Sequence, residues 1–164
     1  MKVRLETRYP EDGDIRLAIT PAKPVEAAIR LRIPGWVKGD IGVSVNGAAV
    51  SAKAVAGEYC EVKRKWKAGD ALCLRLPLAL RVRPAQDDPA TLSFFYGPVL
   101  LAGELGRAGM PSSDVGGDLR GGGNPPLQPP VIRGKSATVQ DLPIAPDPST
   151  PLRFQRKPDR RETP

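Results

Sequence analysis

The sequence predicts an all-β protein, an antiparallel β-sandwich of jelly-roll type with an irregular C-terminal segment. Short stretches in which apolar residues alternate with polar ones are typical of strands with one face in a core and the other in water. The 164 residues include 19 prolines and 17 glycines. This composition disfavours long helices and favours short strands joined by turns.

The clearest predicted strand covers residues 25–33, where every odd-numbered residue is apolar and Arg30 and Arg32 lie between apolar neighbours. It ends at Pro34, because proline cannot donate a hydrogen bond to a neighbouring strand. Residues 14–20 alternate in the same way, and residues 3–8 precede them across a turn-rich connection. These patterns predict three half-buried strands in the N-terminal part of the chain.

Further strands are expected at residues 41–45, 48–50, 58–66, 71–76, 80–83 and 92–102. Asn46 and Gly47 accept the positive φ angles of a tight hairpin turn, so they should join the first two of these strands. The last run is interrupted at Gly97 and Pro98, where we expect the strand to bend. The alternation predicts that the following side chains face inward: Ile15, Leu17, Ile29, Leu31, Ile33, Val43, Val45, Val62, Trp66, Leu72, Leu74 and Leu76.

A change of composition divides the chain into a β-sandwich at residues 1–105 and a Pro/Gly-rich segment at residues 106–164. Eleven of the 19 prolines and eight of the 17 glycines fall in the last 61 residues. Such a segment buries too little apolar surface to offset its ordering entropy, so we expect residues 107–130 to have no regular secondary structure. Short apolar patches at residues 131–132 and 152–154 are candidates for edge strands.

The formal net charge of +7 raises the question of nucleic-acid binding. Most basic residues alternate with apolar ones along predicted strands, which is typical of a solvated sheet face and disfavours a dedicated nucleic-acid site. No apolar run is long enough to cross a bilayer, and the first residues do not resemble a signal peptide. We therefore expect no nucleic-acid or membrane partner, and the compartment is not predicted.

Carboxylate pairs of the kind that glycosidases use are not evident. Asp87 and Asp88 are adjacent, but they precede Pro89 in a predicted turn, where aspartate is favoured because its side chain bonds the local backbone. Glu58, Glu61 and Glu104 are isolated along the sequence. None of these residues is predicted to be catalytic.

The two cysteines, Cys60 and Cys73, cannot supply the ligand set of a structural zinc site, and the chain has no histidine to act as base or ligand. The alternation places Cys60 inward and Cys73 outward, so two free thiols are expected and not a disulfide. The glycines at residues 121–123 are followed by Asn124 and two prolines, which does not fit a phosphate loop. We thus predict no catalytic, cofactor-binding or metal-binding residue.

A sugar-binding surface would need exposed aromatic side chains. The candidates are Trp36, Trp66, Tyr9, Tyr59 and Tyr96. Trp66 shares a strand face with Cys60 and Val62 and is expected in the core, whereas Trp36 follows a turn and is the plausible exposed one, although packing is favoured there too. An autonomous carbohydrate-binding module is therefore kept as an alternative function.

Four separate motifs resemble the β-sandwich region of glycoside hydrolase family 127, which includes β-L-arabinofuranosidases. They are LRIPGW at residues 31–36, VSVNG at 43–47, GEY at 57–59 with KWKAGD at 65–70, and FYGPVLLAG at 95–103. Their order and spacing are kept over roughly residues 3 to 105. The resemblance implies that this portion follows a catalytic (α/α) barrel in the family.

In that family the barrel holds a zinc-bound cysteine thiolate as nucleophile and a glutamate as acid/base. No barrel motif matches this chain, so the resemblance transfers no catalytic or zinc-binding residue, and neither Cys60 nor Cys73 corresponds to the nucleophile. It implies a non-catalytic fragment, inactive alone and without a cofactor of its own. The implied partners are the upstream barrel of a parent enzyme and a homodimer partner.

Overall fold

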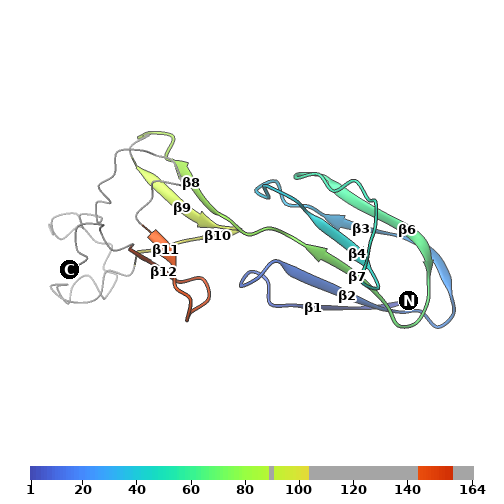
Figure 1. The fold of residues 1–164 in the computed structure, drawn as a ribbon. Coiled ribbons are helices and arrows are strands. Elements are labelled where there is room, and N and C mark those ends of the chain that lie inside the picture. The colour runs from blue at the N-terminus through green and yellow to red at the C-terminus, as the bar shows by residue number, and fades with distance from the viewer. Residues whose placement is uncertain (89–90, 104–143, 157–164) are drawn as a thin grey trace, which may run out of the picture.

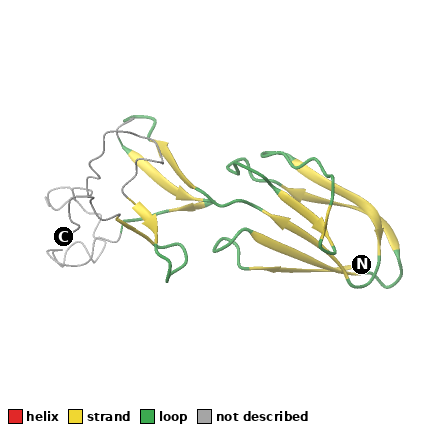
Figure 2. Cartoon of the chain, in the orientation of Figure 1, coloured by secondary structure: helices red, strands yellow, loops and turns green. Residues whose placement is uncertain are grey.

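The computed structural model describes residues 1–88, 91–103 and 144–156. These residues form no helix, and every pair of strands is antiparallel (Figure 2). The predicted all-β class is therefore confirmed, whereas the jelly-roll topology stays a prediction. In the part of the chain that is described, no helix is long and apolar enough to cross a membrane.

The sandwich has a five-stranded sheet and a two-stranded sheet (Figure 1). The larger sheet has the order β1-β2-β7-β4-β5, with the bounds β1 Lys2–Thr7, β2 Asp14–Thr20, β7 Asp70–Arg75, β4 Gly42–Val45 and β5 Ala48–Ala49. The smaller sheet pairs β3 (Val25–Arg32) with β6 (Tyr59–Trp66). All seven strands agree with sequence-predicted segments to within a few residues.

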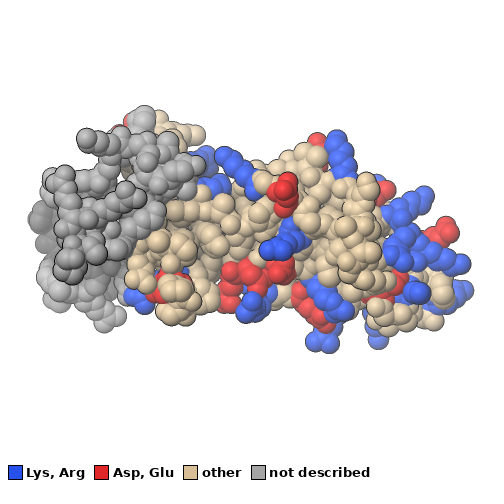
Figure 3. Space-filling model, viewed as in Figure 1, with Lys and Arg blue, Asp and Glu red and all other residues tan. Residues whose placement is uncertain are grey.

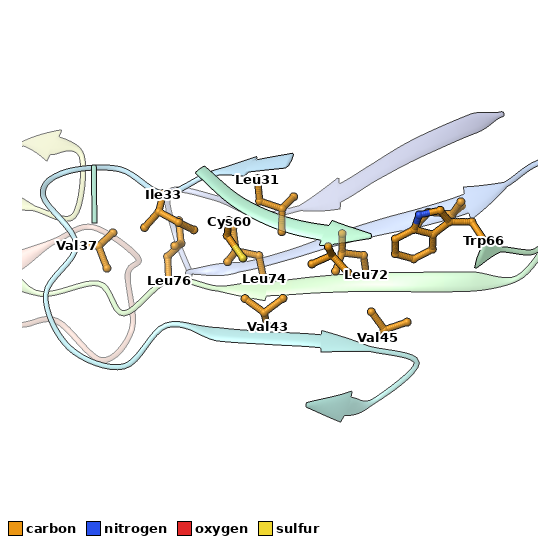
Figure 4. Close-up of a cluster of buried hydrophobic side chains, with 12 residues drawn as sticks. Leu31, Ile33, Val37, Val43, Val45, Cys60, Trp66, Leu72, Leu74 and Leu76 are labelled. Carbon is orange, nitrogen blue, oxygen red and sulfur yellow. The ribbon is translucent and has the colours of Figure 1, made fainter. Parts of the chain in front are cut away.

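The core fills the space between the two sheets (Figure 4). Nine of the twelve side chains predicted to face inward are buried, namely Leu31, Ile33, Val43, Val45, Val62, Trp66, Leu72, Leu74 and Leu76. The other three, Ile15, Leu17 and Ile29, are partly buried and pack against that cluster. Ile19, Val37 and Cys60 complete the cluster. The period-two alternation therefore identified the inner faces of the sheets.

The hairpin between β4 and β5 turns at Asn46 and Gly47, as predicted. Their φ angles are 53° and 83°, which is the left-handed region that a two-residue hairpin turn requires at both central positions. Asparagine tolerates this region better than most residues, and glycine has no Cβ to clash there.

A second group of strands follows β7 and lies beside one end of the sandwich (Figure 1). A three-stranded sheet has the order β10-β9-β8, with the bounds β8 Leu80–Pro84, β9 Leu92–Tyr96 and β10 Val99–Leu100. A separate hairpin pairs β11 (Ile144–Pro146) with β12 (Phe154–Arg156). Of the two patches expected at strand edges, Phe154 thus begins a strand, whereas residues 131–132 lie outside the described residues.

The run at residues 92–102 forms a hairpin and not one bent strand, which corrects the sequence-based expectation. Tyr96 pairs with Val99 across the turn, and Gly97 has a φ of 52°. A glycine with positive φ at the first central position reverses a chain in two residues, and Pro98 fits the second position. The boundary at residue 105 and the expectation for residues 107–130 fall in or beside residues 104–143, which are outside the described part, and both stay predictions.

Leu72→Ala tests the position of the core. The Leu72 side chain is fully buried, whereas Leu5 on β1 is 61% exposed. Removal of a buried leucine leaves a cavity, so we expect Leu72→Ala to lower the free energy of unfolding by about 2–5 kcal/mol. Leu5→Ala is the matched control and should cost less than about 1 kcal/mol. Urea denaturation followed by tryptophan fluorescence measures both, and equal losses would contradict this core.

Candidate functional site

The aspartates that could have formed a catalytic pair lie in an exposed turn. Asp87 accepts a hydrogen bond from the backbone N–H of Asp88 at 3.1 Å, and the Asp88 carboxylate accepts one from the Thr91 hydroxyl at 2.7 Å. Asp88 also accepts the backbone N–H of Thr91 through its carbonyl at 3.0 Å. Both side chains therefore make local hydrogen bonds within the turn, as aspartates in turns commonly do.

The isolated glutamates lie on the surface of the sandwich. Glu61 pairs with Arg30 at 2.7 Å, and Glu58 lies 3.7 Å from Lys53. Glu104 lies outside the described residues. Within the described ranges, no three cysteine, aspartate or glutamate side chains lie close enough together to hold a metal ion.

The two cysteines are free and lie on opposite faces, as predicted. Cys60 is fully buried on the inner face of β6, and burial raises the pKa of its thiol. Cys73 is half-buried on the outer face of β7, where Arg16 and Ser44 are its cross-strand neighbours. The raised pKa of Cys60 disfavours the thiolate that a nucleophile or a zinc ligand requires.

The buried carboxylate of Asp70 lies at one end of the sandwich. The sequence did not predict its role. Asp70 is 1% exposed and accepts hydrogen bonds from the Asn46 side-chain amide and the Lys67 backbone N–H, both at 2.9 Å. The Arg64 guanidinium lies 3.8 Å away. The hydrogen bond from Asn46, then that from Lys67, and the nearby positive charges lower the pKa of Asp70. Asn46 in turn accepts the Ala71 N–H at 2.8 Å, so one cluster ties two hairpin turns together.

Trp66 lies beside this cluster in the core. Its indole N–H donates to the Ala27 carbonyl at 3.0 Å, and the Arg64 guanidinium lies 5.2 Å from the ring centroid. Burying a tryptophan is favourable only if its N–H finds a partner. The bond to Ala27 provides that partner and joins β6 to β3.

Among the aromatic residues, the structure exposes Tyr59 and not Trp36. Tyr59 is 63% exposed on the outer face of β6, and the Arg32 guanidinium lies 5.4 Å from its ring centroid. Arg32 itself is held by hydrogen bonds to the carbonyls of Ile33 and Glu58, at 2.7 and 3.1 Å. Trp36 is half-buried and packs against the core, so the expectation that favoured packing there is confirmed. Tyr96 contacts Phe154 edge to face, with 5.1 Å between ring centroids.

Trp36 also contributes to a junction between the sandwich and the three-stranded sheet. The Arg81 guanidinium of β8 lies 6.0 Å from the Trp36 ring centroid and 5.1 Å from that of Phe95. Its Nη2 donates to the Gly97 carbonyl at 2.8 Å. Arg81 therefore bridges one aromatic ring from the sandwich and one from β9 through cation–π contacts.

Residues 1–78 match the model of the β-L-arabinofuranosidase GH127 middle domain. Residues 1–78, here termed the middle domain, are thus similar to the GH127 middle domain. Three of the solved structures that are similar each align with about 60% of this chain. One is a glycoside hydrolase (31% identity, TM-score 0.53, 17% of its own chain covered). Another is a GH127 β-L-arabinofuranosidase from Geobacillus stearothermophilus T6 (30%, 0.53, 16%), and the third is a GH127 β-arabinofuranosidase (32%, 0.54, 18%).

The chain thus spans about a sixth of the length of the solved structures that it matches. The comparison with curated proteins gave no match. The matched middle domain ends at residue 78, directly before β8 begins at Leu80. Arg81 therefore lies just beyond the end of the matched region, whereas Trp36 lies within it. The resemblance stated from the motifs is confirmed over residues 1–78, and the fourth motif, at 95–103, lies beyond this match.

The charges of the middle domain are mixed and do not form a single basic patch on the face that Figure 3 displays. Lys and Arg side chains lie among Asp and Glu side chains over the sandwich (Figure 3). Several of them form surface pairs, such as Arg30 with Glu61 and Arg8 with Asp12. Exposed pairs of this kind contribute little stability, on the order of 1 kcal/mol or less.

Asp70→Asn should alter how the stability of the middle domain depends on pH. A carboxylate whose pKa is lowered in the folded state stabilises it above the ordinary aspartate pKa of about 4, and this contribution is lost as the pH falls through the lowered value. We expect the wild type to be more stable than Asp70→Asn at neutral pH and the difference to shrink in acid. Urea denaturation at a series of pH values measures this difference.

Asn46→Ala provides the companion variant for Asp70, because it removes the largest cause of the lowered pKa. It should weaken the same acid-dependent contribution, and the double variant should lose less than the sum of the two single losses. A constant stability gap between the wild type and Asp70→Asn across the acid range would contradict the hydrogen-bonded carboxylate.

Arg81→Ala tests the junction. Loss of the guanidinium uncovers the Trp36 ring, so acrylamide should quench tryptophan fluorescence more strongly than in the wild type, while buried Trp66 stays protected. The increase should vanish when Trp36 is also changed to Phe. Arg83→Ala is the matched control, because Arg83 is an exposed residue of the same strand. Unchanged quenching in Arg81→Ala would show that Arg81 does not cover Trp36.

Proposed function

We propose that this chain is a non-catalytic accessory domain of a GH127-type enzyme, and that it supports a catalytic (α/α) barrel supplied by the rest of that enzyme. The observation that supports this most is the match of residues 1–78 to the middle domain of the family. The similar solved structures are about six times longer than the part that this chain matches. In the proposal, hydrolysis belongs to a part of the enzyme other than this domain.

The chemistry of the described side chains supports the same assignment. Most glycosidases use two carboxyl groups about 5–10 Å apart that flank the scissile bond. Asp70 is enclosed by hydrogen bonds from two turns, Asp88 bonds Thr91, and Glu61 pairs with Arg30. Each of these carboxylates thus has a structural role in the sandwich.

Neither cysteine of this chain fits the role of the zinc-bound cysteine of the family. Cys60 points into the core and Cys73 points to the other side of the larger sheet, so the two thiols cannot bind one metal ion. In the proposal, the zinc ion, the cysteine nucleophile and the acid/base glutamate all belong to the barrel. This domain then needs no cofactor, and the homodimer partner that the family resemblance implies stays part of the proposal.

A carbohydrate-binding module is the second candidate, and the exposed Tyr59 ring favours it. Sugar-binding modules stack pyranose rings on aromatic faces, and the fixed Arg32 guanidinium could donate hydrogen bonds beside such a ring. Tyr59 is, however, the one exposed aromatic residue of the described ranges. A single ring gives a weak platform, so the accessory role is preferred.

The purified chain should not hydrolyse an aryl β-L-arabinofuranoside, even with zinc and a reductant present. Loss of a catalytic group commonly costs several orders of magnitude in rate, and without the whole constellation no turnover should exceed the uncatalysed reaction. Release of the aryl group measures this turnover. The GH127 β-L-arabinofuranosidase from Geobacillus stearothermophilus T6 is the positive control for the assay conditions.

Two results would change the assignment. Turnover that disappears in Cys60→Ala or Cys73→Ala would place a nucleophile in this domain and overturn the accessory role. Saturable binding of arabinose oligosaccharides that disappears in Tyr59→Ala, but not in Tyr9→Ala, would favour the carbohydrate-binding module instead.

A further inference from the structure

The inner face of β1 is apolar and uncovered. Val3 and Leu5 are 47% and 61% exposed. Val3 pairs with Ile19 and Leu5 with Leu17 in the antiparallel ladder, and directly opposite residues point to the same side of a sheet. Ile19 is 1% exposed and belongs to the core. Val3 and Leu5 therefore face the same side as the core, but nothing among the described residues covers them.

The connections between the two sheets explain why β1 is left open. Residues 21–24 join β2 to β3, and residues 67–69 join β6 to β7. Such short connections place β3 opposite β2 and β6 opposite β7, because consecutive elements must then lie adjacent in space. On the other side of the sandwich, Val50, Ala52 and Ala54 pack on the core next to β4. The second layer therefore ends at β3, and β1 projects beyond it.

The same open side has an unpaired strand edge. Within the described part of the chain, β3 pairs with β6 alone, so its other edge presents backbone N–H and C=O groups. Val25 of β3, which faces inward opposite Trp66, is still 37% exposed. An unpaired edge next to an uncovered apolar face is a template for one more strand. Proteins that do not use such an edge commonly protect it with a bulge, a proline or an inward charge.

The charges beside this edge favour an acidic occupant. On the outer face of β3, Arg30 and Arg32 outnumber Glu26, and the Arg30 side chain is 71% exposed although it pairs with Glu61. Arg4 on the outer face of β1 is 82% exposed, with Lys2 next to it on the same face and Glu6 as its ion-pair partner. The chain as a whole has a net charge of +7. A second copy would bring like charges together, whereas a strand with outward carboxylates would complement them.

We propose that the open side formed by β1 and β3 binds one extended strand, with aliphatic side chains at alternate positions and acidic ones between them. The strand extends the smaller sheet at the free edge of β3, and its aliphatic side chains cover Val3 and Leu5. Its outward carboxylates lie beside Arg30 and Arg32. The source of the strand rests on the proposed function: it is a segment of the GH127-type enzyme that this middle domain accompanies.

A synthetic nine-residue peptide of alternating valine and glutamate tests the surface. Amide shifts in two-dimensional NMR spectra of the full chain should change saturably in β1 and β3, and the amides of β3 should exchange more slowly with deuterium. A peptide of the same composition with its valines grouped at one end should bind at least tenfold more weakly. A peptide of alternating valine and lysine should also bind at least tenfold more weakly.

The double variant Val3→Ser with Leu5→Ser should weaken peptide binding at least tenfold, because it removes the apolar face without touching the core. Val55→Ser is the matched control and should bind like the wild type, since Val55 is 37% exposed on a different segment. Equal urea midpoints for the wild type and the double variant would show that a loss of peptide binding is not caused by unfolding.

Three results would overturn the proposal. The first is the absence of saturable shifts, and the second is equal binding of the grouped peptide. The third is a set of β1 and β3 shifts that grows with the concentration of the chain alone, because it would identify a second copy as the occupant. These results test only the proposed bound strand, because hydrolysis by the chain is measured in a separate assay. A failure here leaves the accessory role standing.

Discussion

Burial of Trp66 between the two sheets is the interaction on which the rest of the sandwich depends. It is the largest fully buried side chain of the described residues, and a tryptophan of this kind removes about 150–250 Å² from water. Its N–H must be satisfied inside the core, and the Ala27 carbonyl does so. This bond adds a side-chain link to the ladder that pairs β3 with β6, and the ring itself fills the space between the two layers.

The polar cluster at the same end follows from that arrangement. Trp66 directs the Arg64 side chain across its ring toward Asp70. In a site with little water, a carboxylate is tolerated only with hydrogen bonds and nearby positive charge. Asn46 and Lys67 supply the hydrogen bonds. The hairpin at Asn46 and the turn after Trp66 therefore hold each other, although 24 residues separate Asn46 from Asp70.

Much of this fold could be predicted from the sequence, because the relevant signals are local. Alternation along 25–33 and 71–76 gave the strands and their inner faces, and Asn46 with Gly47 gave the hairpin. The Asp70 cluster was missed because a local pattern indicates only a turn at Asp70, and its partner Asn46 lies in a different hairpin turn that is distant in sequence. The hairpin at Gly97 was missed because a glycine within an apolar run is equally consistent with a bend and with a reversal.

The exposed groups were harder to predict than the buried ones. Periodicity says which side chains point toward the core, but not whether the opposite layer extends far enough to cover them. Val3 and Leu5 satisfy the inward pattern and remain exposed, because the second layer ends at β3. Tyr59 lies on an outer face and is exposed, whereas Trp36 packs against the core and Arg81. Both outcomes depend on neighbours that are distant in sequence.

Side chains from the two sides of the end of the matched family region are in contact. The matched region ends at residue 78, yet Trp36 from within it contacts Arg81 from beyond it. Arg81 also bonds the Gly97 carbonyl and lies over Phe95, so a side chain anchored within the three-stranded sheet reaches the sandwich at Trp36. Arg81 therefore contributes to how the three-stranded sheet is oriented against the sandwich. In the proposed accessory role, a partner that contacts both parts depends on that orientation.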